Sequence, residues 1–136
     1  MTKKNKTMKK SIILLLVVAF LVTLTTMSCK KEKPATKTYS ELIVGRWKTA
    51  DGGHYEVYNA NGTGHMWDPA DDVQEDEADN FDWSIDEGNK KMTQIIHFQG
   101  GQGDIPQYCS ILTLDENTFK YNNEGWKAQY TLTRVN

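Results

Sequence analysis

The sequence predicts an all-β domain in which eight antiparallel strands follow one another and close into a small up-and-down barrel. Two observations predict it. From residue 46 onward, short runs rich in β-branched and aromatic residues are broken by clusters of Gly, Asn and Asp. Between these runs no stretch has the length and periodicity of a crossover helix, so neighbouring strands are joined as hairpins. A meander of eight strands removes its exposed edges by closing into a barrel. An open sandwich, or a half-closed sheet plugged by a helix, is the alternative.

The eight expected strands are separated by turn residues such as Asn61-Gly62, which is a strong hairpin signal. The clearest strand is the fourth, where Phe81 and Trp83 alternate with polar residues as they do in a strand with one buried face. In the eighth and longest strand, Trp126 is expected to share the inner face with every second residue that follows. The expected strands span residues 47–50, 54–58, 63–67, 80–86, 91–98, 108–114, 118–121 and 126–135.

A short helix is expected over residues 38–45, directly before the first strand. Thr38 and Glu41 are three residues apart and form a capping box, in which each side chain satisfies a backbone N–H of the other. Gly45 suits the left-handed position that ends a helix. Because a helix this short is not stable alone, it has to pack on the strands.

The amino-terminal part of the chain has the layout of a secretory signal. Five lysines precede residue 11, and residues 12–22 are uninterruptedly apolar, followed by small and polar residues up to Cys29. This apolar run is too short for a membrane-spanning helix, which needs about 20 residues. We therefore expect residues 1–28 to be a signal peptide and the remainder to be exported.

The segment Thr26-Met27-Ser28-Cys29 resembles the lipobox of bacterial lipoproteins. The resemblance implies cleavage before Cys29 and a diacylglycerol on its sulfur, with further acylation by chains such as palmitate. Such chains hold a protein on a bilayer because each buried methylene contributes about 0.8 kcal/mol. Lys30 stands where an Asp would favour retention in the inner membrane, which implies the outer membrane of a Gram-negative envelope, on its periplasmic face or at the cell surface. An uncleaved anchor, or an ordinary signal with Cys29 unmodified, is the alternative.

Charge and cysteine content limit the possible partners. All 18 acidic residues lie after Cys29 and 5 of the 16 basic residues lie before it, so the mature chain has 11 basic residues and a net charge of −7. That charge argues against nucleic acid, which is bound by stripes of Lys and Arg. With Cys29 lipidated, Cys109 has no partner for an internal disulfide. Residues 29–37 are charged and lack apolar periodicity, so we expect a flexible tether followed by one domain, residues 38–136, acting as a monomer.

The triplet Gly45-Arg46-Trp47, preceded by a short helix and opening the first strand, resembles the Gly-x-Trp signature of lipocalins. The resemblance extends over residues 38–136 and is closest to the compact lipocalin-like domains of bacterial lipoproteins. It implies that Trp47 packs across the closed end of an eight-stranded barrel. It also implies that Arg134, near the end of the last strand, lies over the Trp47 ring in a cation–π contact.

Two non-catalytic functions are consistent with these features, and we expect the first, binding of a small ligand, with an interaction module as the alternative. Five aromatic residues are candidates to line a cavity that stacks a small hydrophobic or amphipathic ligand, and no cofactor is expected. If such rings instead fill the barrel, the domain is an interaction or structural module whose loops contact another envelope or host molecule. A ligand pocket usually exceeds about 300 Å³, so a cavity of that size would favour the first function. The candidate ligand-binding residues are Tyr58, Trp67, Trp83, Tyr108 and Tyr130.

The acidic, histidine and cysteine residues that could form a metal or catalytic site are explained more simply by structural roles. The acidic stretch at residues 68–82 lacks the ligand spacing of a calcium loop, so we expect a solvated, mobile loop at the barrel mouth. His54, His65 and His97 could form a zinc site only if distant strands brought them together, and no metal site is expected. Cys109 is expected to be a small buried hydrophobe, although the alternation around it does not decide which face of its strand is inward.

Overall fold

The computed structural model describes residues 35–98 and 103–136. The predicted signal peptide and the lipidation site Cys29 lie outside these residues. The described residues form a short helix, eight strands and two short 3₁₀ turns. In chain order these are α2 (Tyr39–Ile43), β1 (Gly45–Lys48), β2 (Tyr55–Tyr58), β3 (Thr63–Trp67), η1 (Pro69–Asp71), η2 (Glu75–Glu77), β4 (Asp79–Asp86), β5 (Lys91–His97), β6 (Asp104–Leu114), β7 (Thr118–Asn123) and β8 (Ala128–Val135). None of the described helices is long and apolar enough to span a bilayer.

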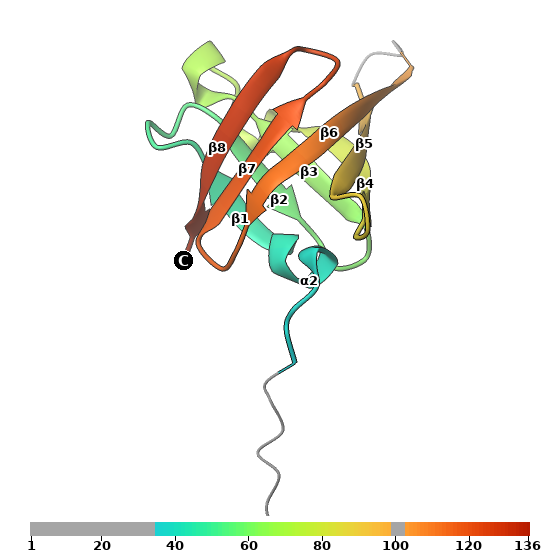
Figure 1. Cartoon of the computed structure of the whole chain (residues 1–136). Helices are drawn as coiled ribbons and strands as arrows, with labels where there is room; N and C mark the ends of the chain where they lie inside the picture. Colours follow the sequence, from blue (N-terminus) through green and yellow to red (C-terminus); the bar gives the residue numbers. More distant parts are fainter. Residues whose placement is uncertain (1–34, 99–102) are drawn as a thin grey trace, which may run out of the picture. The chain divides into compact units, whose positions relative to one another are not determined.

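The strands form a closed barrel in which each one pairs with the next along the chain (Figure 1). All the pairings are antiparallel, and the barrel closes where β1 pairs with β8, with Trp47 opposite Arg134. The predicted eight-stranded meander is therefore confirmed, and the open sandwich is wrong.

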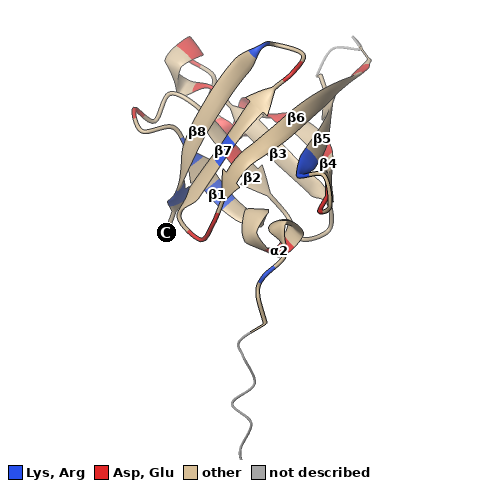
Figure 2. Cartoon of the chain, viewed as in Figure 1, with Lys and Arg blue, Asp and Glu red and all other residues tan. Residues whose placement is uncertain are grey.

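Helix α2 covers one end of the barrel, where the buried side chain of Ile43 joins the core. The other end, which we call the mouth, carries the β1–β2 loop, the β3–β4 segment with η1 and η2, and the β7–β8 turn (Figure 1). In Figure 2 the ribbon is coloured for acidic residues at several places in the loops of the mouth, consistent with the acidic stretch at residues 68–82.

The helix is shorter than predicted, although its capping box is confirmed. The Glu41 backbone donates to Thr38 Oγ1 over 3.2 Å, and the Thr38 backbone donates to the Glu41 carboxylate over 2.8 Å. Gly45 does not end the helix; it begins β1 with φ of +138°. This positive φ favours glycine over other residues. A Cβ at this position would also collide with the Arg134 guanidinium.

Strand β6 is longer than predicted and contains a bulge. The bulge explains why the alternation of apolar and polar residues did not decide which face of this strand is inward. Its register shifts between Ile111 and Thr113. Cys109 and Ile111 therefore face inward before the bulge, and Leu114 faces inward after it. Trp126 is not on the inner face of β8 as expected; it lies in the preceding turn with about half of its surface exposed.

Candidate functional site

The half of the barrel interior next to α2 is filled by aromatic and aliphatic side chains. Trp47 and Phe119 have no exposed surface, and their ring centroids are 5.6 Å apart. Tyr58 packs edge-on against both Phe81 and Phe119. Trp47 Nε1 donates to the Ile43 carbonyl over 2.7 Å, which fixes the helix over the core. The predicted cation–π contact is confirmed, since Arg134 Cζ lies 4.2 Å from the Trp47 ring centroid.

The half of the interior toward the mouth is polar and is organised around Glu56. The carboxylate of Glu56 has no exposed surface. It accepts hydrogen bonds from the hydroxyls of Tyr58, at 2.6 Å, and Tyr121, and it lies 2.9 Å from His54 Nε2. The other ring nitrogen of His54 is 2.5 Å from Asp68 Oδ1, at the start of the β3–β4 segment. His54 thus joins the centre of the barrel to its mouth.

These contacts determine the charge of the cluster. Burial disfavours a charged His54, but its hydrogen bonds to Asp68 and Glu56 outweigh burial and raise its pKa to about 10. Burial first, and then the charge of Glu56, raises the pKa of Tyr58 and Tyr121 well above 10, so both remain neutral donors. At neutral pH His54 is therefore an imidazolium, and it lies between the side chains of Glu56 and Asp68.

The same half of the barrel holds three buried amides. Gln94 donates to the Tyr58 hydroxyl over 2.8 Å, which extends the network around Glu56. Asn123 accepts from the backbone of Gly125 and Trp126 and so shapes the β7–β8 turn. Gln107 is also buried, and its Oε1 has no hydrogen-bond partner among the described residues.

Burial is the main reason that the pKa of Cys109 rises to about 12, so this residue is a neutral thiol inside the barrel.

The structure divides the five predicted ligand-binding residues. Tyr58, Trp83 and Tyr130 face inward, but they are held by their own contacts: Trp83 Nε1 donates to the Thr63 carbonyl, and Tyr130 stacks on Tyr121 with centroids 5.1 Å apart. The expected inward placement of the other two is wrong.

Trp67 and Tyr108 both project from the outer face of the barrel, but Trp67 is only 6% exposed because neighbouring side chains cover it. Trp67 follows the inward Met66 at the end of β3 and stacks on Tyr55, with ring centroids 4.8 Å apart. Arg46 Cζ lies over the Trp67 ring, 5.0 Å from its centroid, and the Arg46 guanidinium pairs with Glu75 of η2. Tyr108 alternates with the inward Gln107 and Cys109 and is 57% exposed. Neither ring can line a cavity inside the barrel.

The three histidines do not meet. His54 lies inside, while His65 is on the outer surface beside Glu75 and His97 is on the outer surface between Asp82 and Asp104. In the described ranges, no three His, Cys, Asp or Glu side chains form a group that could hold a metal ion. The β3–β4 segment is not a free loop, because His54 and Arg46 contact it at two separate points.

The sequence reasoning missed the Glu56 cluster. Alternation along residues 54–58 places His54, Glu56 and Tyr58 on one face of a strand. This spacing is the signal in the sequence that could have predicted the cluster. The cluster was missed because a carboxylate is rarely buried unless it is paired, and two other members of the cluster come from distant parts of the chain: Asp68 from the β3–β4 segment and Tyr121 from β7.

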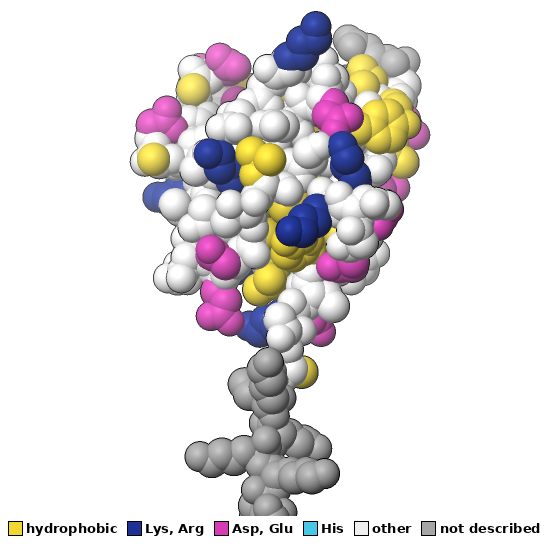
Figure 3. Space-filling view, in the orientation of Figure 1, with side chains coloured by type: hydrophobic (Ala, Val, Ile, Leu, Met, Phe, Trp, Pro, Cys, Tyr) yellow, Lys and Arg dark blue, Asp and Glu magenta, His cyan; other side chains and the backbone are white. Residues whose placement is uncertain are grey.

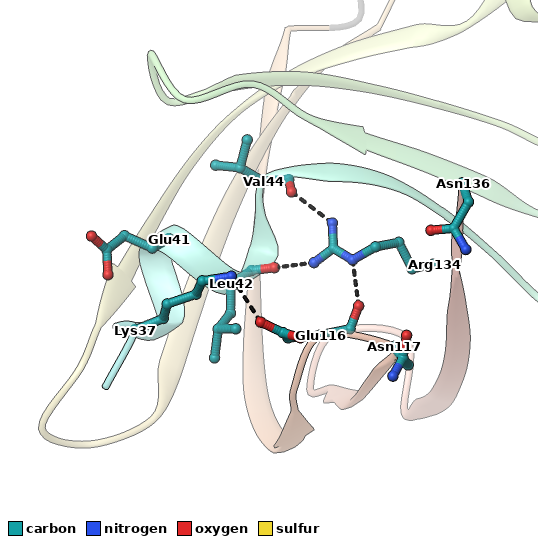
Figure 4. A pocket seen from close by; sticks show the side chains of 8 residues that line it. All are labelled: Lys37, Glu41, Leu42, Val44, Glu116, Asn117, Arg134 and Asn136. Carbon is teal, nitrogen blue, oxygen red and sulfur yellow. Dashed lines mark hydrogen bonds and ion pairs between the residues drawn. The ribbon is translucent and has the colours of Figure 1, made fainter. Parts of the chain in front are cut away.

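A pocket of about 390 Å³ lies outside the barrel at the end covered by α2 (Figure 4). Arg134 is at its centre. Its Nε donates to the Glu116 carbonyl, and its terminal nitrogens donate to the carbonyls of Val44, over 2.8 Å, and Leu42. Lys37 pairs with the Glu116 carboxylate at 2.8 Å on the rim. A second pocket, of about 330 Å³, lies at the β7–β8 hairpin.

The closed barrel, the short helix over one end and the Trp47–Arg134 contact define a lipocalin-like eight-stranded β-barrel. A comparison of the chain with known protein families, curated proteins and solved structures found no match.

Proposed function

We propose that this protein is a lipoprotein anchored in the bacterial outer membrane through Cys29, and that its barrel is a non-catalytic interaction module. The observation that supports this choice over a carrier is the close packing of the half of the interior next to α2. Rings of Trp47, Tyr58, Phe81 and Phe119 occupy the half next to α2.

A hydrophobic ligand entering from the mouth would meet the charged His54–Glu56 pair. It would have to separate this pair or cover it without replacing its hydrogen bonds. Burying a charge without a partner costs several kcal/mol, more than a small apolar contact returns. The inner half could admit a ligand only by displacing close-packed rings, and close packing of this kind resists such a change.

Exposed apolar residues provide the contact surface of the proposed module. Tyr108 and Trp126 are about half exposed, and the Glu124 backbone donates to the Tyr108 carbonyl, so the β7–β8 turn lies beside β6. Figure 3 shows hydrophobic side chains gathered over the part of β6 near the mouth. Exposed Tyr and Trp are typical of protein interfaces. The mouth is opposite α2, which follows the tether, so an anchored barrel would present this surface away from its point of attachment.

Site-specific photo-crosslinking in the native host tests this proposal with the full chain. A photoreactive phenylalanine analogue replaces Tyr108 or Trp126, and the control replaces Thr131, an exposed residue on the outer face of β8. We expect crosslinks to one discrete envelope protein from positions 108 and 126 and none from 131. Equal crosslinking from all three positions would overturn the contact surface.

A ligand titration tests the alternative function, that of a carrier for a small hydrophobic ligand. Purified protein is titrated with fatty acids, haem and bile-type amphiphiles while tryptophan emission is recorded. The filled interior predicts no saturable change. A saturable change with one ligand per chain would restore the carrier function. Intact mass of the purified product separately tests the anchor, since a residue 29 without lipid would overturn that part alone.

A further inference from the structure

The pocket beside α2 has a charge distribution that fits a zwitterion. Two cations and two carboxylates surround it, together with two amides and two apolar side chains (Figure 4). A simple anion would meet the carboxylates, and a simple cation would meet Arg134 and Lys37. A group that carries both charges can satisfy both sets. The lining residues are Lys37, Glu41, Leu42, Val44, Glu116, Asn117, Arg134 and Asn136.

Arg134 has donors left for a ligand. A guanidinium has five N–H groups, and Arg134 uses three of them on backbone carbonyls. Those bonds, together with the Trp47 ring, hold the guanidinium in a fixed position at the pocket. A fixed guanidinium with free N–H groups is well suited to a phosphate, which arginine binds with strong charge-assisted hydrogen bonds.

The Lys37–Glu116 pair can open at little cost. Their side chains are 59% and 70% exposed, and an exposed pair of this kind contributes at most about 1 kcal/mol. When it opens, Lys37 can join Arg134 on a phosphate while Glu116 accepts from an ammonium. Glu41 is less available, because its carboxylate already caps the helix at Thr38.

We propose that this pocket binds the phosphoethanolamine headgroup of a membrane lipid. The choice of a lipid rests on the proposed anchor. The nine residues from Cys29 to Lys37 are joined by eight steps that span at most about 29 Å, so the tether keeps Lys37, on the rim of the pocket, within about that distance of Cys29. A primary ammonium offers three N–H donors to Glu116. The quaternary nitrogen of a choline headgroup offers none, so the pocket prefers ethanolamine.

Arginine side-chain NMR tests the proposal, because the chain has only two arginines, Arg46 and Arg134. The full mature protein, labelled with ¹⁵N-arginine and held in detergent micelles, is titrated with glycerophosphoethanolamine. We expect the Arg134 Nε signal to shift saturably, while Arg46, on the outer face of β1, does not move. Glycerol 3-phosphate and ethanolamine, each with one of the two charges, are expected to bind at least about tenfold more weakly. No shift at Arg134, or equal affinity for glycerol 3-phosphate, would overturn the proposal.

Variants and lipids complete the test. The double change Lys37→Gln and Glu116→Gln is expected to weaken binding about tenfold, and it spares the folded core because both side chains are exposed. Lys120→Gln, on the outer face of β7, is the control and should leave binding unchanged. In phosphatidylcholine nanodiscs, added phosphatidylethanolamine should reproduce the Arg134 shift.

The two proposals can fail separately. Binding of the soluble headgroup without a response to phosphatidylethanolamine would overturn the lipid as its source. An unlipidated Cys29 would overturn the anchor while leaving the headgroup titration intact.

Discussion

Glu56 is the residue whose environment differs most from that of an ordinary strand residue. Its buried carboxylate is surrounded by His54 and two tyrosine hydroxyls. Removing one partner of a buried ion pair typically costs about 3–5 kcal/mol, because the other charge stays buried. We expect Glu56→Gln to lower the free energy of unfolding by about 3 kcal/mol, measured by urea denaturation.

The control for this variant is Asp71→Asn, on the exposed surface of the β3–β4 segment. Its effect should stay within about 0.5 kcal/mol, as for most surface substitutions. A loss below about 1 kcal/mol for Glu56→Gln would show that the carboxylate is not the partner that keeps His54 charged.

His54 gives the protein a dependence on pH in the neutral to alkaline range. The unfolded imidazole releases its proton near pH 6.5, whereas the folded one holds it until about pH 10. The stabilisation is therefore complete below pH 6.5 and is lost as the pH rises toward 10. Between pH 6.5 and 8.5 the loss should reach about 2 kcal/mol, at up to about 1.4 kcal/mol per pH unit.

The measurement is a series of urea midpoints for the wild type and for His54→Gln. Their difference removes the contribution of His97, whose pKa is raised chiefly by its hydrogen bond to Asp104. Below pH 8.5, Cys109 and the buried tyrosines do not interfere, because their unfolded forms ionise at or above about pH 9. Parallel pH profiles for the two proteins would contradict a charged His54.

Among the elements, α2 is stabilised almost entirely by residues outside it. Glu87, in the β4–β5 turn, accepts from the backbones of Tyr39 and Ser40 at 2.9 and 2.8 Å, which satisfies the first turn. Arg134 and Trp47 bind carbonyls at the other end of the helix. Five residues do not form a stable helix in isolation, so these contacts decide whether α2 exists.

We therefore expect Glu87→Ala to destabilise the protein by about 1 kcal/mol, as loss of a helix cap does. Amide exchange in α2 should quicken more than exchange in the strands, and both effects can be measured on the same sample. Glu116→Gln is the control, since that exposed carboxylate pairs with Lys37 and with no other side chain among the described residues. Exchange that quickens equally throughout the barrel would contradict a local role for Glu87.

Several features of the helix and strands could be predicted from the sequence. Alternation predicted β4 to within one residue, and the capping box and the Trp47–Arg134 contact were predicted as well. In β3, however, the inward position 64 is a glycine, where a Cβ would strike the ring of Phe81. A glycine adds nothing to a hydrophobic pattern, so Trp67 was placed on the wrong face.

In β6 and in the Glu56 cluster the missing information is non-local. The bulge between Ile111 and Thr113 reverses which residues of β6 face inward, and the neighbouring residues contain no pattern that predicts a bulge. Buried Gln94, Gln107 and Glu56 break the rule that inward positions are apolar. Their hydrogen bonds join strands that are distant in the sequence, and single-strand periodicity carries no such information.

At the scale of the whole molecule, the two ends of the barrel have different roles. Next to α2 the core is apolar and sealed, and the outer pocket there is lined by charged groups near the tether. Toward the mouth the interior is a polar network, and exposed rings lie outside it. The proposed contact surface and the proposed headgroup pocket rest on this difference between the two ends of the barrel.

The integrity of this arrangement depends on the seam between β1 and β8, which spans only three residue pairs. Thr133 pairs with Lys48 across the seam and with Thr118 on the other side. A proline there removes a backbone donor from a central strand and is tolerated poorly, at a cost of about 3 kcal/mol or more. Thr133→Ala keeps the backbone and removes an exposed side chain whose hydroxyl makes one long hydrogen bond, of 3.4 Å, to the Lys48 carbonyl, so it should change stability by less than about 0.5 kcal/mol.

We expect Thr133→Pro to shift the urea midpoints of tryptophan emission and far-ultraviolet circular dichroism together. The two signals should coincide because Trp47, at the seam, belongs to the same core as strands β4 to β7. If the proline left the circular dichroism transition unchanged and moved only the tryptophan signal, the sheet would be stable without closure. The barrel would then be an open sheet with a loosely attached first strand, and the filled core on which the interaction function rests would lose its support.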